Sequence, residues 1–193
     1  MRLVCLIDDL VKENESLRQI REFLQAKCPG DKAALMTDLL SGTGSAGVGI
    51  LVREHMMNLP PQLLPTMHES LCSDIDWAAE NAEDESEEQD ARFDKLIVVA
   101  PFSYVDQPGA AASGADGSSK KQKRAKTSSS AGGASGGAKL FDRFDDEIFV
   151  QASTWGFDFT GTTLRGAQLF HVAVVPMKAY RECVTSIRSL VSA

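Results

Sequence analysis

Two blocks of opposite charge are the clearest candidate interaction segments of this chain. From Glu80 to Asp90 the run ENAEDESEEQD holds seven acids and no base, and from Lys120 to Lys126 the run KKQKRAK holds five bases and no acid. Blocks of like charge stay solvated and often serve as interaction segments, so the two blocks could attract different partners or one another. The acids that we expect to contact a basic partner are Glu83, Asp84, Glu85, Glu87 and Glu88.

The basic block predicts a nuclear-import signal or a patch that contacts phosphate groups. It contains no aromatic residue, so stacking on bases is not supported and any contact with RNA should be indirect or nonspecific. Simple solubility is the open alternative for both blocks. The residues of the basic block are Lys120, Lys121, Lys123, Arg124 and Lys126.

The histidines and the remaining acids do not form a recognisable catalytic or metal site. His55, His68 and His171 are the only histidines, and none forms a recognisable zinc-ligand pattern with another histidine or a cysteine. The acids of segments 74–76 and 145–147 fit exposed helix surfaces better than a paired-carboxylate active site, because nothing nearby predicts their burial. We therefore predict no catalytic residue, no cofactor and no metal.

A doubled proline joins a predicted strand to a predicted helix within Val48–Trp77. The strand Val48–Arg53 is apolar, and Pro65 suits the first turn of a helix that ends near Ala79. Many nucleotide and coenzyme folds hold a phosphate at such a junction, but proline has no backbone N–H to offer it. The segment Met56–Pro65 has no glycine and three prolines, so no ready-made anion site is predicted.

Length and composition are those of one domain inside the cell. The chain has 193 residues, of which 43% are hydrophobic and 24% charged, and a formal net charge of −7. No apolar run approaches the roughly 20 residues that cross a bilayer, and the amino terminus has no secretory pattern. Four scattered cysteines predict neither a disulfide framework nor a structural metal. We expect a single domain over residues 1–193 and no membrane contact.

Hydrophobic periodicity predicts the helices and strands of the chain. Two segments break the pattern: residues 80–93 predict an acidic solvated loop with a helical start as the alternative, and residues 106–138 predict a disordered basic insertion rich in Gly, Ser and Ala. The order of elements indicates an α/β (α+β) fold. The expected helices are Leu3–Ala26, 31–40, Pro65–Ala79, Phe141–Ala152 and one opened by Pro176; the expected strands are Val48–Arg53, one within Asp94–Tyr104, and an antiparallel hairpin of Thr154–Phe159 with Gln168–Val175.

Several of these segments, in this order, resemble the BCCIP family. They are VGILVREHMMNLPPQLLPTMHESLCSDIDWA, the strand DKLIVVAPFSY, the Lys-rich loop, LFDRFDDEIFVQASTWGFDF and the terminal VAVVPMKAYRECVTSI. The resemblance extends roughly from Leu3 to the end of the chain. Its most specific part is the motif Asn58, Leu59, Pro60, Pro61 and Gln62.

The resemblance implies a GNAT-like fold, a mixed sheet flanked by helices like that of the GNAT-type acetyltransferases, without established acetyltransferase activity. Family members place an acidic tail and further strands before the equivalent of Leu3, so we expect the sheet of this chain to lack its amino-terminal strands. The alternative interpretation is a diverged GNAT-type acyl-CoA transferase.

For function, the resemblance implies a non-enzymatic nuclear adaptor or chaperone that shuttles to the cytoplasm. The implied roles are large ribosomal subunit biogenesis, escort of a basic ribosomal protein, contact with assembly factors, nuclear export, and interactions with cell-cycle and DNA-repair proteins. The acidic block would suit a basic client, because opposite charge accelerates encounter. Nucleic-acid binding through the basic block is a third possibility, which predicts a steep dependence on salt.

Overall fold

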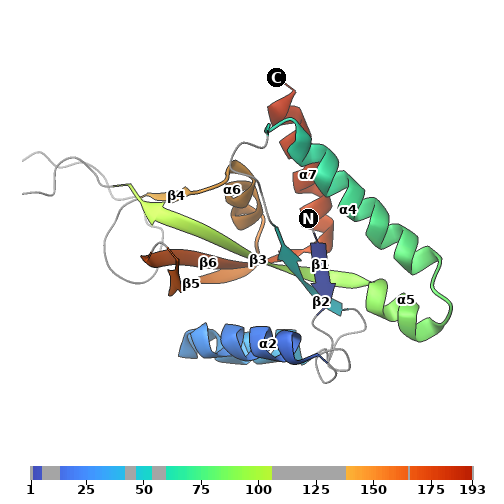
Figure 1. The fold of residues 1–193 in the computed structure, drawn as a ribbon, viewed down its shortest axis with the longest axis horizontal. Coiled ribbons are helices and arrows are strands. Elements are labelled where there is room, and N and C mark those ends of the chain that lie inside the picture. Colours follow the sequence, from blue (N-terminus) through green and yellow to red (C-terminus); the bar gives the residue numbers. More distant parts are fainter. Residues whose placement is uncertain are drawn as a thin grey trace, which may run out of the picture.

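The computed structural model of the chain contains a six-stranded sheet with helices on both faces (Figure 1). It describes residues 2–5, 14–41, 47–53, 60–105, 138–164 and 166–192, and of residues 2–5 it describes the backbone alone. The helices are α2 (Glu15–Lys27), the short 3-10 helix η1 (Gly30–Lys32), α3 (Ala33–Leu40), α4 (Leu63–Glu80), α5 (Glu85–Ala91), α6 (Phe144–Gln151) and α7 (Met177–Val191). The strands are β1 (Arg2–Cys5), β2 (Gly47–Val52), β3 (Phe93–Tyr104), β4 (Lys139–Phe141), β5 (Trp155–Thr163) and β6 (Gly166–Pro176).

The sheet is mixed, and β3 lies at its centre. The strand order is β1-β2-β3-β6-β5, and the short β4 pairs with the far end of β3. The β2–β3 pair is parallel, while the other described pairs are antiparallel. The expected mixed α/β fold with flanking helices and the expected β5–β6 hairpin are therefore confirmed.

Each face of the sheet has its own apolar core. On one face, Leu96 and Val98 of β3 pack with residues of α4, α6 and α7. On the other, Ile97 packs with residues of α2 and α3, which lie on the opposite side of the sheet in Figure 1. Because side chains alternate along a strand, an uninterrupted apolar run such as 96–98 supplies both cores.

The predicted helix Leu3–Ala26 is wrong in its first part. Residues Arg2–Cys5 form β1, which pairs antiparallel with β2, for example Leu3 with Leu51. The helix α2 begins only at Glu15, after Asn14, whose side-chain oxygen accepts hydrogen bonds from the N–H groups of Ser16 and Leu17. An asparagine cap supplies a start signal that the periodicity of residues 3–13 had obscured.

Two further boundaries differ from the predictions. The acidic segment 80–93, predicted as a loop with a helical start as the alternative, contains the helix α5. The predicted helix Phe141–Ala152 begins at Phe144 as α6, because residues Lys139–Phe141 pair with β3 as β4. The strands predicted around 48–53, 94–104, 154–159 and 168–175 are present as β2, β3, β5 and β6.

The insertion 106–138 lies almost wholly outside the described residues. Its two ends are brought together, since the N–H of Val105 donates to the carbonyl of Ala138 at 2.9 Å. Among the described helices, none is both long and apolar enough to cross a membrane.

Candidate functional site

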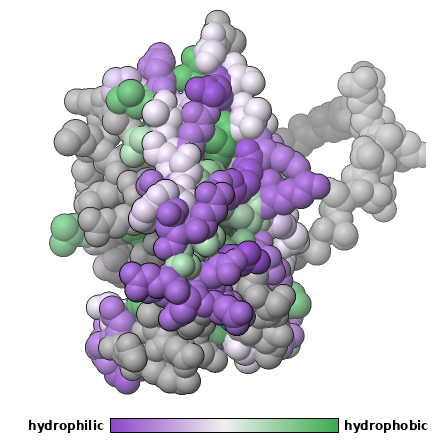
Figure 2. Space-filling model, turned by 90° about the vertical axis from the view of Figure 1, so that its right-hand side faces the viewer, coloured by the Kyte–Doolittle hydropathy of each residue, from purple (hydrophilic) through white to green (hydrophobic). Residues whose placement is uncertain are grey.

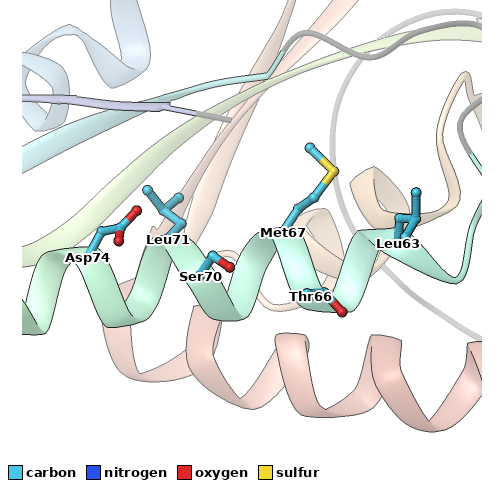
Figure 3. A pocket seen from close by; sticks show the side chains of 6 residues that line it. All are labelled: Leu63, Thr66, Met67, Ser70, Leu71 and Asp74. Atoms are coloured by element: carbon cyan, nitrogen blue, oxygen red, sulfur yellow. The ribbon is translucent and has the colours of Figure 1, made fainter.

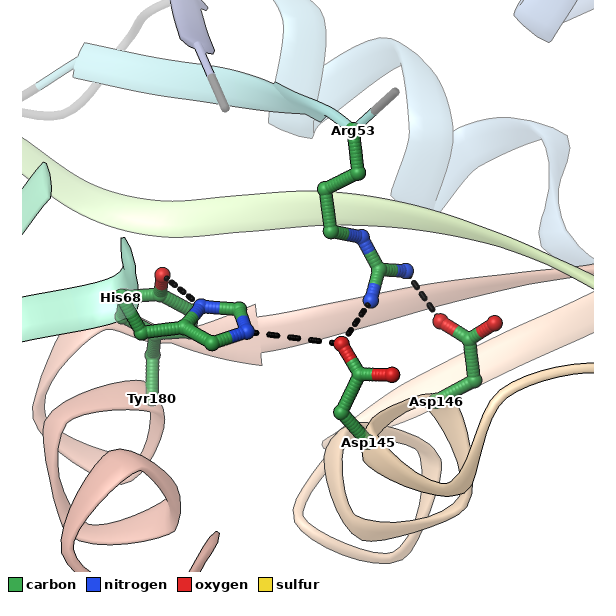
Figure 4. A network of polar contacts seen from close by, with 5 residues as sticks. All are labelled: Arg53, His68, Asp145, Asp146 and Tyr180. Carbon is green, nitrogen blue, oxygen red and sulfur yellow. Dashed lines mark hydrogen bonds and ion pairs between the residues drawn. The ribbon is translucent and has the colours of Figure 1, made fainter. Parts of the chain in front are cut away.

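A buried polar cluster joins four elements where β2 ends (Figure 4). Arg53, directly after β2, extends toward Asp145 and Asp146 in the first turn of α6, and His68 of α4 lies beside Asp145. Tyr180 of α7 completes the cluster through its hydroxyl. The Arg53 side chain is 1% exposed, and both aspartates are fully buried. Solvent therefore does not reach the charges of this cluster.

Arg53 holds the two aspartates together. Its Nη1 donates to Asp145 Oδ2 at 2.7 Å, and its Nη2 donates to Asp146 Oδ1. The guanidinium also lies over the ring of Phe149, 5.5 Å from the centroid. A guanidinium presents several N–H groups in one plane, which allows it to bridge two carboxylates where a lysine would not.

The network assigns a tautomer to His68. Burial raises the pKa of Tyr180, so its hydroxyl stays protonated and can donate to His68 Nδ1, which lies 2.7 Å away. His68 Nε2 lies 3.4 Å from Asp145 Oδ2. With the Tyr180 hydroxyl donating to Nδ1, the Nε2–H is the donor that faces Asp145 Oδ2.

The interpretation of residues 145–147 as an exposed helix surface is wrong for Asp145 and Asp146, whereas Glu147 is exposed as expected. Asp145 and Asp146 are buried, whereas the neighbouring apolar Phe144 is 38% exposed. A helix of eight residues has too few turns for its apolar pattern to specify its inner face, and the two acids turn inward because the Arg53 guanidinium hydrogen-bonds to both of them. The other pair, Asp74 and Asp76, does lie on the surface as expected.

We expect Asp146 to make folding stability depend on pH. Burial raises the pKa of Asp146 from 3.8 to about 6, although Arg53 opposes that shift. Because the folded-state pKa is the higher one, this group stabilises the fold fully below its unfolded pKa, and that stabilisation is lost as pH rises through about 6. Between pH 7.5 and pH 5, this carboxyl alone should add roughly 1 kcal/mol to the free energy of unfolding.

Urea unfolding of the Asp146→Asn variant at the two pH values measures this contribution. When the pH is lowered from 7.5 to 5, the free energy of unfolding of the variant should rise by roughly 1 kcal/mol less than that of the wild type. Asp142→Asn, an exposed aspartate just before α6, should keep the wild-type dependence. Identical pH dependence in Asp146→Asn and wild type would show that the Asp146 carboxyl does not titrate in this range.

The cluster fits a structural role better than an acid–base site. General acid–base chemistry needs a group that reaches the substrate, and all five side chains are buried. The Phe149 ring stacks on Tyr180, with centroids 5.2 Å apart, and closes one side of the cluster.

Sequence patterns missed Arg53 because its partners lie 92 and 93 positions away.

The start of α4 offers few free amides to an anion. The carbonyls of Pro60 and Pro61 accept from the N–H groups of Leu63 and Leu64 at 3.0 and 3.1 Å. The third helical residue, Pro65, has no N–H. These local turns use or remove three of the amides with which a helix start would bind phosphate.

The acidic block is carried largely by α5. Asp84 Oδ1 accepts from the N–H of Glu87, and the Glu87 carboxylate accepts from the N–H of Glu83, both at 2.9 Å. This reciprocal pattern stabilises a helix start in the manner of a capping box. Glu88 pairs with Arg92 one turn later. Asp84 and Glu87 are therefore structural as well as charged, and Glu83 and Glu85 are exposed.

A groove runs along α4 to α5. Its first part, about 300 Å³, is lined by α4 residues from Leu63 to Asp74, and Figure 3 shows Met67, Leu71 and Asp74 rising from one side of the helix. Its second part, about 370 Å³, shares Leu71 and Asp74 with the first and continues to Phe93. Figure 2, which faces this side of the molecule, shows hydrophilic residues around paler hydrophobic ones.

A second histidine–aspartate contact lies on the β5–β6 hairpin. Asp158 Oδ1 accepts from His171 Nδ1 at 2.5 Å and from Lys139 Nζ at 2.6 Å. Burial alone would raise the pKa of Asp158, but the hydrogen bonds from Lys139 and His171 outweigh it and hold that pKa below its ordinary value. Burial lowers the pKa of His171. Its Nε2 lies against the backbone of Gly156, so the pair is not open to a substrate there.

Some of the predicted site residues lie outside the described part of the chain. These are the whole basic block, Lys120, Lys121, Lys123, Arg124 and Lys126, and the motif residues Asn58 and Leu59. Pro60, Pro61 and Gln62 are described and lie just before α4. Within the described ranges, no group of three or more His, Cys, Asp or Glu side chains is placed to hold a metal ion.

Comparisons with solved structures support the fold. A crystal structure of BCP1 from Saccharomyces cerevisiae superimposes with a TM-score of 0.55 at 11% sequence identity, and the match covers 96% of this chain and 60% of that one. At this identity the likeness concerns the fold alone.

Comparisons of sequence concern the family. Protein BCCIP homolog of Arabidopsis thaliana is 28% identical over 148 residues, covering 77% of this chain and 40% of that protein. Protein bcp1 of Aspergillus fumigatus is 27% identical over 73 residues, covering 37% of this chain and 25% of that protein. This chain thus spans less than half the length of either relative. A family model described as BCCIP matches residues 4–149, from β1 into α6, and since it spans more than half of the chain, the chain belongs to the BCCIP family.

Proposed function

We propose that this protein is a non-enzymatic adaptor or chaperone of the nucleus that shuttles to the cytoplasm. Its clients are a basic ribosomal protein and assembly factors, and its processes are large ribosomal subunit biogenesis, ribosomal-protein escort and nuclear export. Interactions with cell-cycle and DNA-repair proteins are part of the same proposal. Membership of the BCCIP family supports an adaptor role, and no relative named above carries an enzyme name.

The exposed acidic helix α5 is the observation that carries this proposal. Three glutamates, Glu85, Glu87 and Glu88, lie in its first turn, where the positive end of the helix dipole favours them. No base occurs between Glu80 and Ala91, so the field of this surface is negative throughout. A basic client would be attracted over a distance of about 10 Å at moderate salt, and its affinity for RNA would be masked while it is bound.

The alternative of an acyl-CoA transferase is supported less well. Ligands of open α/β sheets bind outside the carboxyl ends of parallel strands. The described part of that region, after β2, holds Arg53, which is neutralised by Asp145 and Asp146 and is not available to a pyrophosphate. The start of α4 adds the blocked amides of Leu63 and Leu64. Saturable micromolar binding of acetyl-CoA in calorimetry would favour the alternative.

Affinity purification of the full chain, followed by identification of the bound proteins, tests the proposal. Ribosomal proteins and assembly factors should dominate. The variant Glu83→Lys/Glu85→Lys keeps the capping residues Asp84 and Glu87, and should bind a purified basic ribosomal protein about tenfold more weakly at 50 mM salt, with a smaller difference at high salt.

A matched reversal on the opposite face is the control. Glu22→Lys/Asp38→Lys changes the net charge equally but alters the exposed surface of α2 and α3, and should leave client binding nearly unchanged. Client affinity that is the same for wild type and Glu83→Lys/Glu85→Lys at every salt concentration would remove α5 from the proposal.

A further inference from the structure

The groove along α4 has an apolar floor that continues from one helix to the next. Leu71, Ile75 and Ala78 form a stripe on α4, and Ala91 and Phe93 extend it at the end of α5 and the start of β3. At the other end, Leu63 and Met67 prolong the stripe by two turns. Leu63 is 48% exposed, and Met67, Ile75 and Ala78 are half-buried. The apolar floor gives the groove side chains that a partner could cover.

The rim of the groove is acidic. Asp74 lies where its two parts meet, and Glu87 and Asp90 line the side formed by α5. In the described part of the chain, Asp74 and Asp90 form no ion pair, and no lysine or arginine lines either part of the groove. Charge complementarity therefore selects an occupant that is basic at its edges and apolar in its centre.

The length of the groove selects a helix of about four turns. Leu63 and Ala78 lie fifteen positions apart on α4, which is roughly 22 Å at the rise of an α-helix. A partner helix of about fifteen residues with apolar positions at i, i+3, i+4 and i+7 would match this stripe. Lysine or arginine residues beside that stripe would meet Asp74, Glu87 and Asp90.

The basic block of the same chain is a poor occupant. The insertion that carries it leaves and re-enters the sheet at Val105 and Ala138, whereas Phe93 in the groove lies at the opposite end of β3, roughly 36 Å away. Only twelve residues separate Lys126 from Ala138, and their full extension reaches about 40 Å. Docking in cis at the Phe93 end of the groove, beside Glu87 and Asp90, would hold that arm almost straight, at a large entropic cost.

We propose that the α4–α5 groove binds a basic amphipathic helix of a protein partner, with Leu71, Ile75 and Ala78 receiving its apolar side and Asp74, Glu87 and Asp90 receiving its cations. This inference rests on the proposed adaptor function and specifies the site and the shape of the client segment. Apolar contact sets which partner is accepted, and the acidic rim sets how fast it is captured.

A labelled synthetic peptide of about fifteen residues tests the groove by fluorescence anisotropy with the full chain. In the patterned peptide, leucines form one helical stripe and lysines fill the flanks; in the dispersed peptide, the same residues are arranged without a stripe. The wild-type chain should bind the patterned peptide at least tenfold more tightly. Equal affinity for the two peptides, or no binding of the patterned peptide, would overturn the proposal.

Two groove variants separate the contributions of shape and charge. Ala78→Gln narrows the floor without changing charge, and Asp74→Lys/Asp90→Lys reverses the rim while keeping the capping residue Glu87. Each variant should bind the patterned peptide about tenfold more weakly than the wild type. In the rim reversal, the affinity for the peptide should also depend less on salt concentration. The control Glu22→Lys/Asp38→Lys should bind like the wild type, and an equal loss in that control would show that net charge alone is responsible.

Thermal unfolding of each variant verifies that it folds. If the rim reversal does not fold, the peptide affinity of the uncharged variant Ala78→Gln decides the outcome. A groove variant that loses the peptide yet still captures ribosomal protein overturns the groove as the client site and leaves the adaptor function standing. A wild-type chain that binds the peptide through the groove but captures no ribosomal protein overturns the adaptor function instead. Tighter binding of the patterned peptide after deletion of residues 120–126 would show that this block occupies the groove in cis, and would overturn the trans partner.

Discussion

Replacing Arg53 with methionine should lower the free energy of unfolding by about 3–5 kcal/mol. Methionine keeps an apolar stem over Phe149 but removes both hydrogen bonds to Asp145 and Asp146, which are fully buried. Two buried carboxylates without their cation must either stay charged at great cost or take up protons. Urea unfolding at pH 7.5 measures the loss, and at pH 5 the loss should be smaller because protonation relieves the repulsion.

Arg92→Met is the matched control for this prediction. Arg92 pairs with Glu88 one turn away, but its side chain is 63% exposed, so its replacement should change stability by less than about 1 kcal/mol. The double variant Arg53→Met/Asp146→Asn should recover part of the loss, since it leaves one buried carboxylate fewer. If Arg53→Met unfolds at the same urea concentration as the wild type, the buried bridge does not hold β2 to α6 in solution.

Replacing Gly156 with alanine should destabilise the protein by about 3 kcal/mol or more. A Cβ atom there would lie 2.3 Å from the carbonyl oxygen of Val172 and 2.7 Å from His171 Nε2, both on the neighbouring strand β6. A backbone oxygen cannot rotate away as a flexible side chain can, so β5 would have to move off β6. Urea or thermal unfolding gives the loss directly.

Two other glycines separate steric clash from backbone strain. At Gly30 nothing lies within 4 Å of an added Cβ, so Gly30→Ala should stay within about 0.5 kcal/mol of the wild type. Gly166 has a φ of 112° and equally open space, so Gly166→Ala should cost about 1 kcal/mol through strain alone. If Gly156→Ala is as stable as Gly166→Ala, the edge strand β5 can move away from β6 at little cost in stability, which would contradict this prediction.

Local sequence patterns were sufficient to predict most strands of the sheet. A strand buried on both faces is apolar at every position, and the run Leu96–Ala100 predicted β3 in this way. A strand with one buried face is apolar at every second position, and the alternation of Trp155, Phe157 and Phe159 predicted β5. The helix α5 was within reach too, since Asp84 and Glu87 form a capping pattern at the spacing that starts a helix. Its charge density concealed that signal.

The β1 strand and the buried acids were not predictable in this way. Residues Arg2–Cys5 are a strand because β2 provides their hydrogen-bond partners, and that pairing joins segments almost fifty positions apart. The same holds for β4, which is three residues long and exists through its pairing with the end of β3. Tertiary pairing overrides local propensity in such short strands.

From its residues alone this chain specified a mixed α/β fold, its core strands, two opposed charge blocks, a proline-blocked helix start and membership of the BCCIP family. Only the tertiary structure placed Arg53 between Asp145 and Asp146, sealed that cluster with His68 and Tyr180, and aligned α4 with α5 around an acidic groove. Charge and period are properties of neighbouring residues, whereas burial depends on what the rest of the chain folds against them.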